Sequence, residues 1–184
     1  SVSANAADLR VGFKSEPSSI DPHYHNLGPN NGFATHIFGT LVGSDENQQH
    51  YPDLATSWKP VNDTTWEFKL RKGVKWHDGK PFTSADVKFT VMDVLKKVHP
   101  RGPNSFREVT SIDTPDAHTA VFNLKKPAPY MMRSFSAYES PIVPKHLLEG
   151  KDVKDAPLKN KPVGTGPFKF VEWKKGQYIY RCYF

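Results

Sequence analysis

Histidine is the residue type in this chain with the clearest potential for chemistry, because imidazole binds transition metals and exchanges protons near neutral pH. His23-x-His25 has the spacing of a metal-binding pair, and His36 or His50 could add a ligand for nickel or zinc. The pair lies in a loop flanked by proline and glycine, where water can solvate both rings, and no group of carboxylates or cysteines completes a site. We therefore predict no metal site.

Other catalytic and cofactor-binding patterns are incomplete. Gly164-Thr165-Gly166 lacks the third glycine of a dinucleotide fingerprint, and it also lacks the lysine and serine of a phosphate-binding loop. The chain contains no Gly-x-Ser-x-Gly nucleophile elbow, and its carboxylates are scattered along the sequence. We predict no catalytic residues, no cofactor and no enzymatic activity. Assembly of an active site from distant residues is the alternative that the sequence leaves open.

Composition narrows the class of protein. The 184 residues include one cysteine, Cys182, so an intrachain disulfide or a cysteine-based zinc site is excluded. The net charge of +6 comes from lysines that alternate with acidic residues, a distribution that argues against a nucleic-acid-binding face. No apolar run approaches the roughly 18 residues of a membrane span, which predicts a soluble protein. Ala4-x-Ala6 is typical of either a trimmed export signal or an expression remnant, and we favour export.

The most regular pattern lies in the middle of the chain. Trp66, Phe68 and Leu70 alternate with charged residues, which predicts a half-buried strand. A turn at residues 60–63 would join it to a partner strand at residues 56–59, and Asp78-Gly79 predicts a second tight turn.

A helix should follow this strand pair. Thr83 and Asp86 have the spacing of a capping box at the start of a helix. The amphipathic stripe that continues from this cap consists of Val87, Val91, Val94, Leu95 and Val98.

Shorter patterns complete the expected elements, which mix strands with helices. We predict an irregular loop at residues 15–22, where two prolines disfavour helical geometry. Further strands are predicted at residues 9–14, 109–113, 119–124, 168–173 and 178–180, and helices at residues 30–41, 129–135 and 145–148.

Two segments together carry a resemblance to a known family. Residues 51–91 and the later Val163-Gly164-Thr165-Gly166-Pro167-Phe168 resemble the bacterial extracellular solute-binding proteins of family 5, the oligopeptide, dipeptide and nickel receptors of ABC importers. The resemblance implies a mixed α/β (α+β) fold that forms the first lobe of a two-lobed periplasmic binding protein. It further implies that residues 1–44 begin the main lobe, residues 45–163 form an inserted β-rich subdomain, residues 164–184 return to the main lobe, and the second lobe is absent.

The same resemblance implies a function. It predicts a truncated receptor for short peptides, located in the periplasm or at the cell surface, whose partners are a peptide or small-molecule ligand and the membrane permease of an ABC transporter, with no nucleic acid. The alternatives are a receptor for nickel or a metal chelate in the same family, and an interaction module that is not a receptor. Family topology, rather than a ligand motif, selects the candidate ligand-binding residues, which are Glu16, Pro17, Ser18, Ser19, Arg101, Asn104, Tyr138 and Glu139.

Overall fold

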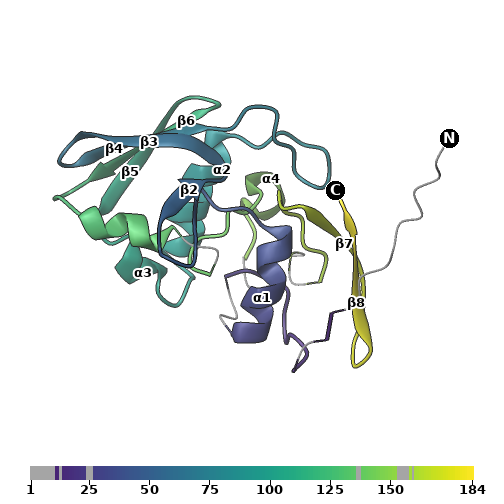
Figure 1. Cartoon of the computed structure of the whole chain (residues 1–184). Helices are drawn as coiled ribbons and strands as arrows, with labels where there is room; N and C mark the ends of the chain where they lie inside the picture. The colour runs from purple at the N-terminus through teal and green to yellow at the C-terminus, as the bar shows by residue number, and fades with distance from the viewer. Residues whose placement is uncertain (1–10, 13, 24–26, 136–137, 153–157, 159) are drawn as a thin grey trace.

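The computed structural model describes residues 11–12, 14–23, 27–135, 138–152, 158 and 160–184 of the chain. Helices and strands alternate along it, which confirms the mixed α+β class (Figure 1). The described elements, in chain order, are α1 (Gly28–Ile37), β1 (Val42–Ser44), β2 (His50–Pro52), β3 (Ala55–Asn62), β4 (Thr65–Leu70), α2 (Ser84–Phe89), a π-helical segment (Thr90–Leu95), α3 (Gly102–Ser105), β5 (Val109–Asp116), β6 (Thr119–Leu124), a 3₁₀ helix (Pro129–Ser134), α4 (Lys145–Leu148), β7 (Phe168–Lys174) and β8 (Tyr178–Tyr183).

An antiparallel sheet of four strands, in the order β3-β4-β6-β5, forms one side of the molecule (Figure 1). The predicted alternation in β4 is confirmed, since Phe68 and Leu70 are buried while Lys69 is exposed. The predicted turn at residues 60–63 begins too early, because β3 continues to Asn62 with an irregular register after Pro60. This proline is tolerated because β3 is an edge strand of the sheet, where proline is commonly found.

Aromatic rings fill the inner face of this sheet. Phe68 lies 4.9 Å from Phe122 and 5.2 Å from Phe135, measured between ring centroids. Phe122 and Phe135 are themselves 5.7 Å apart, so the three rings pack as a closed group. Phe68, Phe122 and Phe135 are completely buried, whereas Trp58 and Trp66 are only partly buried against the core that contains these rings.

Helix α2 covers this core and begins where the capping box predicts. The backbone N–H of Thr83 donates to Asp86 Oδ2 over 2.9 Å, and the reciprocal contact of the box is also present. Helical structure ends at Leu95 rather than at Val98, and its second half is π-helical. The chain then turns back so closely that a Cβ added to Gly102 would lie 2.1 Å from the carbonyl oxygen of Leu95.

Helix α1 is shorter than the sequence pattern predicts. It ends at Ile37 instead of residue 41, because Phe38 adopts an extended backbone conformation. The backbone beyond it pairs with other segments: Gly39 O accepts from the N–H of Ile142 over 2.9 Å, and Thr40 O accepts from the N–H of Leu54 over 3.0 Å. These tertiary hydrogen bonds replace further helical turns.

Strands β7 and β8 form a separate antiparallel hairpin near the second apolar core, which surrounds α1. Both strands confirm the prediction, and the turn between them contains Gly176 at a φ of +74°. The predicted strand at residues 9–14 lies largely outside the described residues. Within the described part of the chain, no helix is both long and apolar enough to cross a membrane.

Candidate functional site

Three loops that are distant in sequence meet at one place, around a pair of buried histidines. The Nε2 atom of His23 donates to the carbonyl oxygen of Pro141 over 2.7 Å. The His23 ring also lies 5.7 Å from the ring of His99, in an edge-to-face arrangement. The segments at residues 14–23, 99–104 and 138–143 therefore lie side by side, the second of them running into α3, and every predicted ligand-binding residue belongs to one of them.

Arg101 and Glu139, two predicted site residues, contact each other directly. The guanidinium group makes a two-pronged ion pair with the carboxylate, with Nε to Oε2 at 3.0 Å and Nη2 to Oε1 at 2.5 Å. The Arg101 side chain is 56% exposed and that of Glu139 is 23% exposed. Such a pair can exchange partners with an incoming ligand, because a ligand carboxylate can replace Glu139 and a ligand cation can replace Arg101.

His99 shapes the backbone on which Arg101 lies. Its Nδ1 atom accepts hydrogen bonds from the N–H groups of Arg101, at 3.2 Å, and Gly102, at 3.0 Å. Burial lowers the pKa of His99, although the Glu139 carboxylate acts in the opposite direction. Burial also lowers the pKa of His23, to about 3, so both rings are neutral at pH 7. Sequence reasoning missed His99, because a single histidine before a proline carries no recognisable pattern.

The first loop is held by the side chain of Asn30 on helix α1. Asn30 Oδ1 accepts from the N–H of Ser18 over 2.9 Å, and its Nδ2 group donates to Ser18 Oγ over 3.1 Å. Ser19 Oγ accepts from the N–H of Asp21 over 3.1 Å. Pro17 and Ser19 are buried, whereas Ser18 is exposed. Of these three predicted residues, Ser18 presents the most surface.

Glu16 is joined to the hairpin at the far end of the sequence. Its Oε1 atom accepts from Trp173 Nε1 over 2.7 Å and from the N–H of Gly176 over 2.9 Å. The hydrogen bond from Gly176, followed by that from Trp173, holds the pKa of the Glu16 carboxyl group below its usual value. A ligand that used this carboxylate would have to share it with the turn between β7 and β8.

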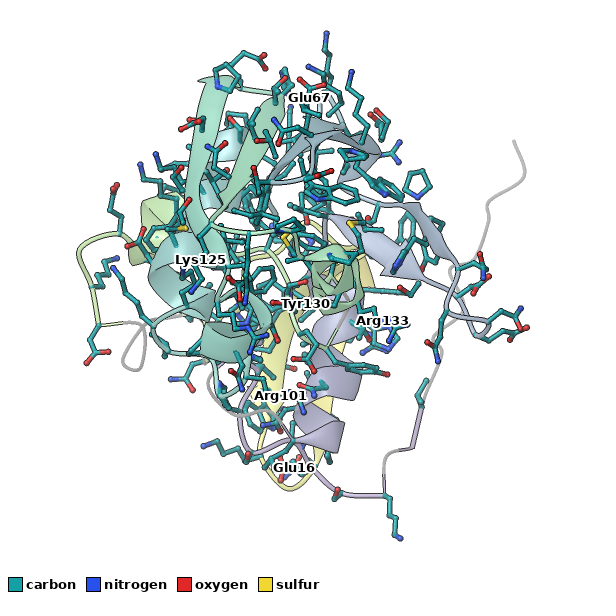
Figure 2. The ribbon with its side chains drawn as sticks, turned by 90° about the vertical axis from the view of Figure 1, so that its left-hand side faces the viewer. Glu16, Glu67, Arg101, Lys125, Tyr130 and Arg133 are labelled. Carbon is teal, nitrogen blue, oxygen red and sulfur yellow. The ribbon has the colours of Figure 1, made fainter. Side chains whose placement is uncertain are left out.

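Asn104 and Tyr138 are the two remaining predicted residues, and both are exposed. Figure 2 shows that Arg101 and Glu16 lie on the same face of the molecule, with Arg101 nearer to the centre.

A second histidine, His77, connects the two sequence segments that carry the family resemblance. Its Nε2 atom donates to Gly166 O over 2.8 Å, and its Nδ1 atom accepts from the N–H of Gly164 over 3.2 Å. A Cβ added to Gly164 would lie 1.9 Å from the carbonyl oxygen of Ile37, so only glycine fits there. The Gly164-Thr165-Gly166 segment is thus a packing junction, a role that was not predicted from the sequence. We call these contacts the His77 clasp.

The geometry of the candidate metal-binding histidines can be described for His23, His36 and His50, but not for His25. His25 lies outside the described residues, and His23 Nε2 is already bonded to Pro141 O. His50 Nδ1 contacts Ser44 Oγ at 3.0 Å, and His36 lies against the ring of Phe168. Within the described ranges, no three histidine, cysteine or acidic residues gather in a way that could hold a metal ion.

Comparison with known proteins gives a consistent result. Residues 49–180 match the model of the bacterial extracellular solute-binding proteins, family 5 Middle. The oligopeptide-binding protein AppA of Bacillus subtilis is 34% identical over 182 residues, which are 94% of this chain and 33% of AppA.

Solved structures agree with the sequence comparison. AppA in complex with a nonapeptide superimposes with a TM-score of 0.79 at 30% identity, covering 89% of this chain and 34% of AppA. NikZ of Campylobacter jejuni in complex with Ni(L-His) superimposes with a TM-score of 0.76 at 32% identity. The match covers 90% of this chain and 33% of NikZ. The ABC transporter substrate-binding protein CtaP of Listeria monocytogenes superimposes with a TM-score of 0.77 at 29% identity. The match covers 94% of this chain and 36% of CtaP. The chain thus spans about a third of the length of these relatives.

Proposed function

Because the chain belongs to the bacterial extracellular solute-binding proteins of family 5, we propose that it forms part of a receptor that binds short peptides for an ABC importer. The observation that carries the proposal is the meeting of three loops beside the Arg101–Glu139 ion pair. The family consists of transport receptors, which is consistent with the prediction that the chain is not an enzyme. The proteins of this family are extracellular, which supports a location of the chain in the periplasm or at the cell surface.

The Arg101–Glu139 pair suits a peptide, because a peptide carries both an ammonium and a carboxylate group. Arg101 would bind a carboxylate through two parallel N–H groups, while Glu139 would bind an ammonium group or a backbone N–H. Ser18, Asn104 and Tyr138 would add adaptable polar contacts, since all three are exposed on these segments. Glu16 would take part by exchanging its hydrogen bond with Trp173 for one with the ligand.

In the complete receptor, we propose that the ligand bridges two lobes and stabilises a closed state that the permease recognises. This chain would contribute one wall of the cleft. Residues 45–163 would form the β-rich subdomain, and residues 164–184 would return to the main lobe through the His77 clasp. A single wall cannot exclude water from a bound peptide, so its hydrogen bonds would contribute little affinity.

Titration calorimetry with tri-alanine and penta-alanine tests the proposal. The 184-residue chain should bind with a Kd near 1 mM, or about 4 kcal/mol, and a protein extended to the length of its relatives should bind at least a hundredfold more tightly. In the extended protein, Arg101→Gln should weaken binding roughly tenfold, since a hydrogen bond to a charged group contributes about 1.5 kcal/mol or more. Arg133→Gln, on the same face, is the control. Equal effects of the two substitutions would contradict the role of Arg101.

A second candidate ligand is a nickel chelate, which is favoured by the similarity to NikZ. Arg101 could bind the carboxylate of a chelator, but the described residues offer no three-ligand site for bare metal. Titration of the extended protein with Ni²⁺ in the presence and absence of histidine would separate the two ligands. Saturable heat with nickel and histidine, and none with peptides, would select the chelate.

A further inference from the structure

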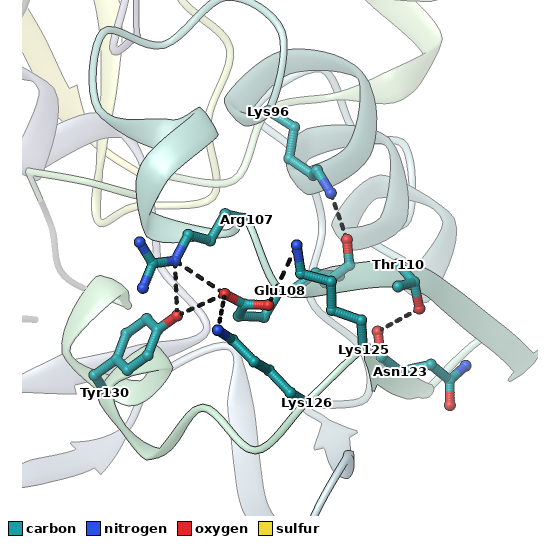
Figure 3. A network of polar contacts seen from close by, with 9 residues as sticks. Lys96, Arg107, Glu108, Thr110, Asn123, Lys125, Lys126 and Tyr130 are labelled. Atoms are coloured by element: carbon teal, nitrogen blue, oxygen red, sulfur yellow. Dashed lines mark hydrogen bonds and ion pairs between the residues drawn. The ribbon is translucent and has the colours of Figure 1, made fainter.

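A cluster of cations surrounds one buried carboxylate, and its residues are not among those predicted to bind ligand. Glu108 is only 3% exposed, yet Arg107 Nε lies 3.0 Å from Oε1, Lys126 Nζ 3.6 Å from Oε1, and Lys125 Nζ 3.5 Å from Oε2. Lys96 reaches the same place and donates to the carbonyl oxygen of Val109 (Figure 3). We call Lys96, Arg107, Lys125 and Lys126 the basic cluster.

The basic cluster carries more positive charge than Glu108 can balance. Within the described residues, Glu108 is the one carboxylate within 4.0 Å of Arg107, Lys125 and Lys126. The side chains of these three cations are 54–62% exposed. Although burial raises the pKa of Glu108, the neighbouring lysines and Arg107 hold it below its usual value, so the carboxylate is ionised. One cation would suffice to pair it, and the others form an outward-facing positive field.

An apolar loop adjoins the basic cluster directly in the sequence. Pro127, Pro129 and Tyr130 are exposed, immediately after Lys125 and Lys126. The ring of Tyr130 is fixed in place, because its hydroxyl group accepts from Arg107 Nε over 3.2 Å and the Arg107 guanidinium lies 5.5 Å from the ring centre. Two of these prolines also line a hollow of about 230 Å³, whose other walls are Pro60, Asn62, Asp63, Trp66 and Ala128. Basic and apolar groups thus share one surface.

This combination points to the kind of partner. The carboxylate of Glu108 already occupies the space between the two lysine ammonium groups, so a single small anion has no vacant place there (Figure 3). An extended anionic surface, in contrast, responds to the whole field of the cluster. Tyrosine and proline rings beside lysines match the boundary between phospholipid headgroups and acyl chains, where amphipathic rings are favoured.

We propose that the basic cluster and residues 127–130 dock this chain onto a membrane surface rich in anionic phospholipids. Docking would keep a receptor that serves a membrane transporter close to that membrane. Figure 2 shows Lys125 and Tyr130 on the same face as Arg101, and both lie farther from Glu16 than Arg101 does.

Vesicle flotation without peptide tests this proposal independently of ligand binding. The chain should bind vesicles of phosphatidylglycerol and phosphatidylcholine, but not vesicles of phosphatidylcholine alone. Binding should weaken as the salt concentration rises from about 0.05 M to about 0.5 M, because screening shortens the range of the field. The double substitution K125Q/K126Q should reduce affinity roughly thirtyfold, since each basic residue near an anionic surface contributes about 1 kcal/mol.

The matched control is K72Q/K75Q, which removes the same charge from two exposed lysines outside the cluster. It should leave binding within about twofold of the original protein, because these lysines lie outside the docking surface. Tyr130→Ala should weaken binding by a smaller factor and leave its salt dependence unchanged. Three results would each overturn the proposal. They are equal losses of vesicle affinity in the two double-lysine variants, equal binding to both kinds of vesicle, and no binding to anionic vesicles. Circular dichroism verifies that every variant is folded.

Discussion

The four-stranded sheet and the β7–β8 hairpin are stabilised in different ways. Phe68 and Phe122 are fully buried on the sheet, and β4 and β6 each lie between two neighbouring strands. The hairpin exposes much of its aromatic surface, including 48% of Tyr180 and 80% of Tyr183. Its main polar attachments are the Glu16 carboxylate at its turn and the His77 clasp, which positions the segment that enters β7.

This contrast shows how stability is distributed in the chain. Burial of apolar rings is non-directional and independent of pH, so the sheet should tolerate exchanges between apolar side chains that preserve volume. The hairpin packs Phe170, Trp173 and Ile179 only partly against the second core, and several of its few attachments are directional hydrogen bonds that involve titratable groups. The sheet should therefore respond most strongly to loss of volume, and the hairpin to changes in protonation or backbone position.

The largest effect is expected for Phe122→Ala in the sheet. Removing a fully buried ring leaves a cavity and should lower the free energy of unfolding by about 3–5 kcal/mol. The hairpin counterpart, Tyr183→Ala, should change it by no more than about 0.5 kcal/mol, because the residue is largely exposed. Urea unfolding measures both values. Similar losses for the two variants would remove the distinction between the two regions.

A smaller but substantial effect is expected at the His77 clasp. Gly164→Ala places a Cβ 1.9 Å from the carbonyl oxygen of Ile37, so the backbone must move, at a cost of about 2–3 kcal/mol. Gly28→Ala is a suitable control, because no atom lies within 4 Å of the added Cβ. Thermal unfolding should show a large decrease in Tm for the first variant only. Tolerance of alanine at residue 164 would show that the clasp is loose.

Acid should weaken the histidine-dependent contacts before the sheet core. Burial lowers the pKa values of His77, His99 and His23 in the folded state, the last to about 3. Their stabilising contribution is complete above the unfolded value of about 6.5, and it decreases as the pH falls toward each folded value, by about 1.4 kcal/mol per pH unit for each histidine.

Urea unfolding between pH 7.5 and pH 5 tests this expectation. His99→Asn should reduce the pH dependence, because asparagine can accept the same backbone hydrogen bonds as Nδ1 without titrating. A pH dependence that is unchanged in this variant would assign the effect to other groups.

The smallest effect on stability, but a clear effect on association, is expected at the outer surface of the hairpin. Its exposed aromatic residues lie on strands that each have a single partner within the described residues, and such edges recruit other chains. Sedimentation velocity should show association that increases with protein concentration. Tyr180→Lys with Tyr183→Lys should reduce it, because charged side chains oppose edge pairing. A monomer at every concentration would contradict the expectation.

Local patterns in the sequence predicted the elements well where local physics determines them. The Thr83–Asp86 capping box and the alternation around Phe68 depend on neighbouring residues, and both are confirmed. The end of α1 was predicted wrongly, because its termination depends on hydrogen bonds from Leu54 and Ile142. The Arg101–Glu139 contact spans 38 residues and depends on how two loops fold back, so no local pattern indicates it. The ligand-binding role of these residues stays a prediction.

The contact between Glu16 and Gly176 has a consequence for the order of folding. The two residues are 160 positions apart, and the His77 clasp joins residues separated by 89 positions. Contacts of such high sequence separation incur a large loop-closure entropy, which slows folding. As the chain emerges from the ribosome or from an export channel, Glu16 appears about 160 residues before Gly176, whereas the strands of the sheet appear between them. We therefore expect the loop that carries Ser18 to reach its final position after the sheet has formed.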